Sequence, residues 1–294
     1  MVHKLLNDRQ NRVTVIDNLD TAKFNKADFA DYKNLFEFIE GDLSTMDSEV
    51  LFKMFKKHDK IYHLAGSVGV ALGDQKPKET LYNNVGLAHK LVPLFDRAKT
   101  HVVFSSTSEI YGEGPTFTEE DACGIGPTSK NRWAYSTSKM LTEFMIRASD
   151  CPHTIVRFFN VVGPGQLGDF GMVLPRFVNA AKAGEDLIVH GDGSQVRAFC
   201  HVTDAVDALV KVSGISGELF NIGNSDEPVT MLELAQRVVA LSGSTSKIVL
   251  VPYEQAFSDK FVDIMYRVPN VDKLRAATGL KPKHDLDDII KDML

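Results

Sequence analysis

The sequence predicts an α/β fold with a doubly wound parallel sheet, and three observations lead to that prediction. The first half of the chain alternates short β-branched runs with helical segments. The runs show little polar alternation, which is typical of parallel strands covered by helices on both faces. Polar residues gather directly after two of the runs, at Asp17 and at residues 105–109. The carboxyl ends of strands in such sheets are where ligands bind.

Five strands are expected in order along the first half of the chain. They are residues 12–17, 36–40, 60–64, 101–105 and 153–158, which are rich in β-branched and aromatic residues. Amphipathic helices are expected over residues 47–57, 79–98 and 132–149. Residues 1–10 indicate the end of a helix, and residues 285–294 a short amphipathic helix. Right-handed crossovers between these strands make the sheet doubly wound.

The character of the sequence changes after residue 162. Residues 163–168 form a turn-rich break, after which helices mix with short extended pieces. We therefore expect residues 1–162, with 198–223 returning to them, to form the sheet-containing part. Residues 163–197 and 224–294 are expected to form a smaller C-terminal lobe packed on it.

Composition and charge argue against several classes of protein. The 294 residues are 44% hydrophobic and 24% charged, and 33 Lys+Arg against 39 Asp+Glu give a net charge of −6. An acidic chain without a basic run is not expected to bind nucleic acid. Its apolar runs are too short for a membrane span, and no signal core follows the N-terminus. The three cysteines lack disulfide or metal-site spacing, so we expect no metal and a cytoplasmic location.

The front of the chain lacks one feature of a dinucleotide-binding fold. Such a fold normally opens with a strand and a glycine-rich turn whose amides meet the pyrophosphate, and no such turn precedes Asp17. Residues 12–17 match its second strand, and Asp17 is placed to accept hydrogen bonds from the adenosine ribose. Two explanations stay open: a start codon assigned at an internal methionine, or a genuinely shortened protein with weakened cofactor affinity.

Tyr135 and Lys139 are the first candidates for chemistry. Their i, i+4 spacing places both side chains on one face of a helix. A nearby ammonium stabilises tyrosinate, so we expect it to lower the pKa of the phenol and to let Tyr135 exchange a proton with a sugar hydroxyl. A solvated helix face has the same pattern, so the pair alone is a weak signal.

A run of hydroxyl residues upstream strengthens that interpretation. Residues 105–109 follow an apolar strand and comprise four hydroxyl residues and Glu109. At this edge of the sheet Thr107 is placed to hydrogen-bond a substrate oxygen beside Tyr135. The alternative is a capped strand-to-helix turn, in which Ser and Thr are common.

Further motifs accompany these two features. They are residues 15–19, 40–43, 63–66, 83–85, 106–108, 158–160 and 191–197. Together with Tyr135 and Lys139 they resemble the extended short-chain dehydrogenase/reductase family of nucleotide-sugar epimerases, dehydratases and decarboxylases. The resemblance runs from about residue 3 to the C-terminus and lacks only the family's opening strand and glycine motif.

The resemblance implies a Rossmann-type fold, a tightly bound NAD and a nucleotide-sugar substrate. Tyr135 would remove the proton of the sugar 4-hydroxyl, Lys139 would hold the cofactor ribose, and Thr107 would contact the same sugar oxygen. The other implied cofactor-binding residues are Asp17, Asn18, Leu19, Asp42, Leu43, Leu64, Ala65, Gly66, Asn83 and Phe159. Those implied at the substrate's nucleotide diphosphate are Asn160, Leu174, Arg176 and Arg197, since an arginine fork pairs with phosphate oxygens. For Arg176 a surface charge is an equal alternative. Family members commonly dimerise through two long helices, here residues 79–98 and 132–149, so a homodimer is expected.

The reaction after oxidation at C4 depends on a few residues. Dehydratases of the family place an Asp-Glu pair after the catalytic Thr, whereas this chain has Ser108 and Glu109. Residues 107–109, 132–139 and 263–270 resemble the UDP-glucuronate decarboxylases, in which Arg267 would act at the sugar carboxylate. Ser108, Glu109 and Arg267 would then position the carboxylate and manage the proton that returns to C5. A salt bridge closing the lobe onto the sheet is the alternative for Arg267. The alternative functions are a UDP-sugar 4-epimerase and a truncated pseudoenzyme with weak or no NAD binding.

Overall fold

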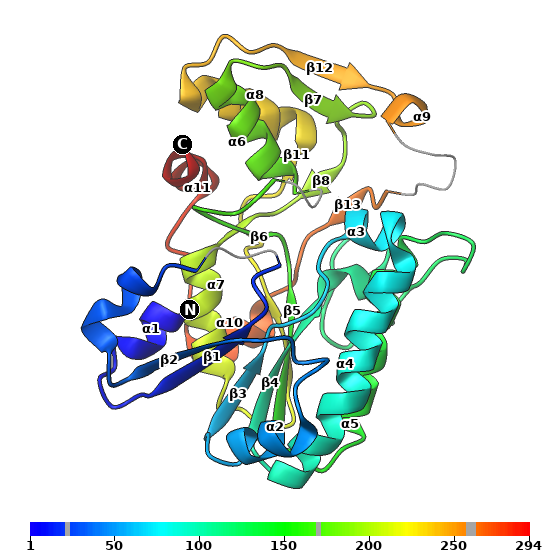
Figure 1. Ribbon diagram of the computed structural model, residues 1–294. Coiled ribbons are helices and arrows are strands. Elements are labelled where there is room, and N and C mark those ends of the chain that lie inside the picture. The colour runs from blue at the N-terminus through cyan, green and yellow to red at the C-terminus, as the bar shows by residue number, and fades with distance from the viewer. Residues whose placement is uncertain (21–23, 169–171, 257–262) are drawn as a thin grey trace.

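The computed structural model describes residues 1–20, 24–168, 172–256 and 263–294. Its centre is a four-stranded parallel sheet in the order β10-β5-β4-β3 (Figure 1). The strands are β3 (Lys60–His63), β4 (His101–Thr107), β5 (His153–Phe158) and β10 (Leu219–Ile222). This arrangement confirms the α/β fold with a parallel sheet that the sequence predicts.

Helices cover both faces of this sheet, because successive residues of a strand point to opposite sides. Val102 and Ile155 face one buried cluster, which α2, α4 and α5 complete. Val103 and Val156 face the other cluster, with α7 and α10. The helices are α2 (Ser48–Phe55), α4 (Pro77–Ala98), α5 (Trp133–Arg147), α7 (Val202–Val212) and α10 (Asp272–Thr278). Burial on both faces explains why the strand sequences lack polar alternation.

Two further strands form a separate parallel pair. β1 (Val13–Asp17) and β2 (Phe36–Glu40) are paired along their whole length. Within the described ranges no strand ladder joins β1 to β3. A hydrogen bond between His58 Nε2 and Thr14 Oγ1, at 3.1 Å, connects the two parts. The gap between β1 and β3 is thus the place where the sequence predicts that the usual first strand of a dinucleotide-binding fold is lacking.

A second layer of structure lies beyond the carboxyl ends of the main strands (Figure 1). It contains α6 (Val173–Ala183), β7 (Leu187–His190), α8 (Met231–Ser242), β12 (Ile248–Val251) and α11 (Leu286–Met293). The helices share a buried apolar cluster with β7. Capping boxes at Thr230 and Asp285 fix where α8 and α11 begin. The expected amphipathic helix at the C-terminus is therefore confirmed, and its apolar face closes this cluster.

The remaining elements are short. They are α1 (Val2–Leu6), η1 (Lys26–Tyr32), α3 (Val70–Gln75), η2 (Ser108–Tyr111), β6 (Val161–Val162), β8 (Val196–Arg197), β9 (Cys200–His201), β11 (Val229–Thr230), α9 (Tyr253–Ala256) and β13 (Tyr266–Arg267). β13 and β11 pair with β8, and β6 pairs with β9. The bounds expected from the sequence for β1 to β5, α2, α4 and α5 agree with the structure to within two residues at each end. None of the described helices is long and apolar enough to cross a membrane.

Candidate active site

A cavity of about 850 Å³ opens at the carboxyl ends of β4 and β5, beneath the C-terminal layer. Small-molecule sites typically measure about 300–1,000 Å³. Among the residues that line it are the predicted Leu64, Thr107, Ser108, Glu109, Tyr135, Lys139, Asn160, Leu174, Arg176, Arg197 and Arg267. The fold therefore brings all the predicted catalytic residues, and all four of those predicted at the substrate, to one cavity.

Tyr135 and Lys139 lie one turn apart on the buried face of α5. The Lys139 ammonium donates a hydrogen bond to the backbone carbonyl of Ser105 at 2.9 Å. The phenol of Tyr135 shares a side-chain hydrogen bond with Thr107, the last residue of β4. Thr107 also accepts a hydrogen bond from the backbone N–H of Glu109 at 3.2 Å. Thr107 is therefore both the cap of η2 and the neighbour of the phenol, so its two predicted roles coexist.

Burial shifts the pKa values of both residues on α5. It raises the pKa of Tyr135 to about 12, and the hydrogen bond with Thr107 opposes that rise only in part. It lowers the pKa of Lys139 to about 8, against a smaller opposing effect of the Glu143 charge. The expectation that Lys139 lowers the Tyr135 pKa is thus corrected. The ammonium is hydrogen-bonded to the Ser105 carbonyl, and the loss of water around the phenol is the dominant effect.

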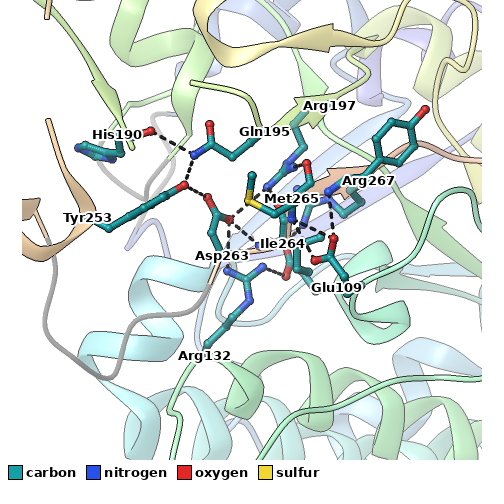
Figure 2. Close-up of polar contacts among 12 residues, drawn as sticks. Glu109, Arg132, His190, Gln195, Arg197, Tyr253, Asp263, Ile264, Met265 and Arg267 are labelled. Atoms are coloured by element: carbon teal, nitrogen blue, oxygen red, sulfur yellow. Dashed lines mark hydrogen bonds and ion pairs between the residues drawn. The ribbon is translucent and has the colours of Figure 1, made fainter. Parts of the chain in front are cut away.

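Glu109 lies within a buried cluster of charged side chains (Figure 2). Its Oε2 accepts a hydrogen bond from Arg132 at 2.6 Å, and its Oε1 is paired with Arg267. Arg267 also donates to Oδ1 of Asn160 at 2.6 Å. Burial lowers the pKa of Arg267 to about 10. The salt bridge considered as the alternative for Arg267 is therefore present, and it lies inside the cavity.

Asp263 is the second acid of the cluster. Its Oδ1 lies 3.2 Å from NH2 of Arg197, and its Oδ2 accepts a hydrogen bond from the Tyr253 hydroxyl at 2.7 Å. Arg197 also donates to the backbone carbonyl of Ile264 at 2.6 Å. Figure 2 shows these contacts side by side with those of Glu109. The resemblance assigns Arg197 to the diphosphate of the substrate. In the structure its guanidinium contacts Asp263 and Ile264, in the segment that precedes Arg267.

Arg176 lies on α6 at the other side of the cavity. Its guanidinium donates to the backbone carbonyl of Ile188 at 3.1 Å. Burial lowers its pKa. Leu174, two residues earlier, is fully buried. Arg176 is thus a partly buried, cavity-lining cation, which favours its predicted role over that of a surface charge.

The residues predicted at the adenosine end lie at the ends of β1 and β2, outside the cavity. The Asp17 carboxylate accepts a hydrogen bond from the backbone N–H of Leu19 at 2.7 Å, and Leu19 has a positive φ of 61°. Hydrogen bonds from Ser44, and a weaker one from Asn18, lower the pKa of Asp42. Leu43 packs at the edge of the buried cluster below α4. The pairing of Asp17 with Glu40 at the ends of β1 and β2 brings these residues close together.

Phe159 and Asn83, two of the predicted cofactor-binding residues, have surroundings different from those of the residues next to them in the sequence. The ring of Phe159 is fully buried against Tyr111, and the residue before it, Phe158, lines the cavity. Asn83 is exposed and donates to the Ser67 hydroxyl at 3.1 Å. The residue after it is buried: Asn84 accepts from the Ser67 N–H at 2.8 Å and donates to the Ser138 hydroxyl at 3.0 Å. On a helix, successive residues point in different directions, so Asn83 and Asn84 have different surroundings.

Sequence reasoning missed several residues of the cluster. Arg132, Tyr253, Asp263, His190 and Gln195 all line the cavity, and none was singled out as a site residue. The signal that the sequence offered for Arg132 was its position one helical turn before Tyr135, on the same face of the predicted helix. The others come from the C-terminal layer, whose position over the strands is a tertiary property. In the described ranges no group of His, Cys, Asp and Glu side chains could hold a metal ion.

The chain belongs to the NAD-dependent epimerase/dehydratase family, whose sequence model matches residues 1–223. It is 35% identical to UDP-N-acetyl-alpha-D-glucosaminuronate decarboxylase of Bacillus cytotoxicus, over 97% of this chain and 90% of that protein. It is 30% identical to UDP-glucuronic acid decarboxylase 3 of Arabidopsis thaliana, over 96% and 80% of the two chains. The solved structure of Pal from Bacillus thuringiensis superposes with a TM-score of 0.85 at 26% identity, covering 99% of this chain and 92% of that one. The protein is therefore an enzyme of this class, and NAD is its cofactor.

The residues at the strand ends fit an extended dinucleotide. Asp17 lies at the end of β1, and Gly66 follows β3 next to Lys139. A Cβ at Gly66 would lie 2.8 Å from Oδ1 of Asn84 and 3.6 Å from the Lys139 ammonium, and φ there is +148°. Only glycine suits this backbone position. Asp17, Leu64, Ala65, Gly66, Tyr135 and Lys139 are thus the residues that would hold NAD.

Proposed function

We propose that the enzyme removes the carboxylate of a UDP-linked uronic acid as carbon dioxide, through a 4-keto sugar. UDP-glucuronate and its 2-acetamido form are the candidate substrates. One observation carries the proposal: the Glu109–Arg267 pair lies in the same cavity as Tyr135, so an arginine is available for the sugar carboxylate. The names of the two decarboxylases that the chain resembles support it.

The residues on α5 and β4 handle the sugar 4-hydroxyl. Bound NAD would take up the hydride from C4 and later return it. As a tyrosinate, Tyr135 accepts the proton of the sugar 4-hydroxyl and gives it back when the C4 ketone is reduced again, while Thr107, its hydrogen-bond neighbour, contacts the same sugar oxygen. Lys139 would hold the cofactor ribose beside Tyr135, and its ammonium donates to the backbone carbonyl of Ser105 in β4.

Oxidation at C4 makes the uronate a β-keto acid. The bond between C5 and the carboxylate then breaks, its electron pair moves into the enolate of the C4 ketone, and one proton must return to C5. Arg267 holds the carboxylate while it is still present, because its fork suits bidentate binding. Ser108 and Glu109, both buried beside Thr107, position the water that delivers the proton.

The substrate nucleotide fits the part of the cavity under the C-terminal layer. Arg176 and Asn160 line it with polar groups, and Leu174 with an apolar one. Arg197 supports this region through its contacts with Asp263 and Ile264. We propose that these four predicted residues bind the substrate. Arg197 acts indirectly, because it holds the segment with Asp263 and Ile264 in place.

Product analysis tests the reaction. The purified enzyme is incubated with UDP-glucuronate and, separately, with its 2-acetamido form, with Tyr135→Phe as the inactive control. We expect carbon dioxide and a UDP-pentose, or its acetamido equivalent, by mass spectrometry. A product epimerised at C4 with unchanged mass would replace the proposal with a 4-epimerase, and no turnover of either sugar would contradict it.

We also propose that the enzyme acts in the cytoplasm as a homodimer through α4 and α5. These helices pack on each other and expose large apolar side chains to solvent, with Tyr82 72% and Phe144 63% exposed. All three cysteines are free thiols, as a reducing compartment requires. Analytical ultracentrifugation of Phe144→Glu should show a monomer, whereas Leu250→Glu, on exposed β12, should leave the dimer intact. A wild-type monomer would contradict the dimer.

A further inference from the structure

Arg132 is a cavity-lining arginine that the proposed reaction has not yet used. It is the N-cap residue of α5, one helical turn before Tyr135, and only 4% of it is exposed. Its NH2 donates to Oε2 of Glu109 at 2.6 Å, and its NH1 lies 3.8 Å from Asp263. A buried arginine in this position is tied to Glu109 on one side and to Asp263 on the other.

Glu109 consequently has a different arginine on each carboxylate oxygen. Arg132 takes Oε2 and Arg267 takes Oε1. The two arginines differ in what else they do. Arg267 also donates to Oδ1 of Asn160, a neutral acceptor, whereas Arg132 also faces the carboxylate of Asp263. Arg267 is thus the arginine whose second partner a substrate carboxylate can replace, and Arg132 is the one held by two acids.

The carboxylate of a uronic acid changes the pairing within the cluster. Arg132, Arg197 and Arg267 face Glu109 and Asp263. Asp263, Glu113, Asp74 and Tyr253, in decreasing order, also act on Arg132 and oppose the effect of burial on its pKa. The substrate carboxylate adds one more acid to these groups. When it draws on Arg267, Glu109 keeps a cation only if Arg132 stays in place.

We propose that Arg132 is a positioning residue that keeps Glu109 ionised and aimed at the sugar while Arg267 binds the substrate carboxylate. The inference rests on the proposed decarboxylation. Two carboxylates that share a single cation in a buried site would favour protonation of one of them. With Arg132 present, each carboxylate has its own arginine, and Glu109 stays an acceptor that orients water toward C5. Arg132 acts through Glu109 and does not touch the sugar.

The test compares Arg132→Met and Arg132→Lys with the wild-type holoenzyme. For Met we expect kcat at pH 6–7 to fall about 10- to 100-fold, and the acid limb of the kcat profile to move up by about one pH unit or more. KM for the UDP-uronate should change less than about threefold, because the carboxylate still meets Arg267. Lys should restore most of the acid limb, because it returns the charge. An acid limb unchanged in Arg132→Met, or a raised KM with normal kcat, would overturn the inference.

Arg157→Lys is the matched control. Arg157 and Glu143 form another buried arginine–glutamate pair, at 2.7 and 3.0 Å, and neither residue lines the cavity. Its disruption should lower stability and leave the acid limb where it was. An equal shift in this control would show that Arg132 matters only for the fold.

A second readout does not depend on turnover. The ¹³C signal of the Glu109 carboxyl, assigned with Glu109→Gln, is titrated by NMR in wild type and Arg132→Met. We expect the titration midpoint to rise by about one pH unit or more in the variant. An unchanged titration midpoint would contradict the proposed role of Arg132 even if carbon dioxide is formed. A raised midpoint in a protein that forms no carbon dioxide would confine the failure to the proposed reaction.

Discussion

The effect of burial on the pKa of Lys139 can be measured through the pH dependence of the free energy of unfolding. Its pKa is about 8 in the folded chain against 10.5 for an ordinary lysine, with desolvation as the first cause. Because the folded pKa is the lower one, the unfolded chain binds more protons between pH 8 and 10.5. The stability of the fold therefore rises with pH through this window and is constant, as far as Lys139 is concerned, below it.

The change Lys139→Met removes the titrating group and retains the length of the side chain. The free energy of unfolding of wild type, minus that of the variant, should rise by about 3 kcal/mol over the whole window, of which about 2.5 kcal/mol falls between pH 7 and 10. Urea denaturation at half-unit pH steps, on protein freed of bound nucleotide, measures this difference. The variant also loses the hydrogen bond to Ser105. That loss is the same at every pH, so it shifts the whole difference in unfolding free energy without changing its dependence on pH.

Lys99→Met is the control for this titration. Lys99 is on the surface, and its contacts with Asp96 and Asp150 raise its pKa. Its difference curve should show no rise between pH 7 and 10. A flat curve for Lys139→Met, or one that falls with pH, would refute the claim that desolvation controls this lysine.

Three further outcomes are expected. Tyr135→Phe should lower turnover at least about 10²-fold in a product assay while the fold, followed by circular dichroism, is unchanged, since only the exchangeable proton is lost; near-normal turnover would remove Tyr135 from the mechanism. Glu109→Gln should stop pentose formation but leave NADH absorbance, because oxidation at C4 does not need the carboxylate, and a mild effect together with carbon dioxide release would contradict the mechanism. Thr230→Ala should cost about 1 kcal/mol in thermal unfolding, since the capping box of α8 loses its side chain; an unchanged Tm would mean that the cap adds nothing.

The sequence predicts the parallel strands well, because their signal is local. β2 and β5 have the predicted bounds. In β5 a run of β-branched residues is buried on both faces, which has no other simple explanation. The spacing of Tyr135 and Lys139 also places them correctly on α5.

The electrostatics of the site could not be predicted in the same way. The Tyr135 pKa depends on how much water the C-terminal layer removes, and the partners of Glu109 come from α5 and β13, far apart in sequence. Nothing in the sequence distinguishes Asp263 from other acidic residues. Only the fold brings its carboxylate to 3.2 Å from Arg197. Residues that act by desolvation and by long-range pairing leave no periodic trace in a sequence.

The division of the sheet has a consequence for how the protein opens. β1 and β2 share a ladder with each other, and the catalytic side chains are carried by β4, η2, α5 and β13 on the other side of the break. Native proteins open in cooperative units with separate free energies. The backbone amides of β1 and β2 should therefore exchange with deuterium earlier than those of β4 and β5. An enzyme built in this way can release the adenosine end of its cofactor by a local fluctuation while the residues that hold the reacting sugar stay folded.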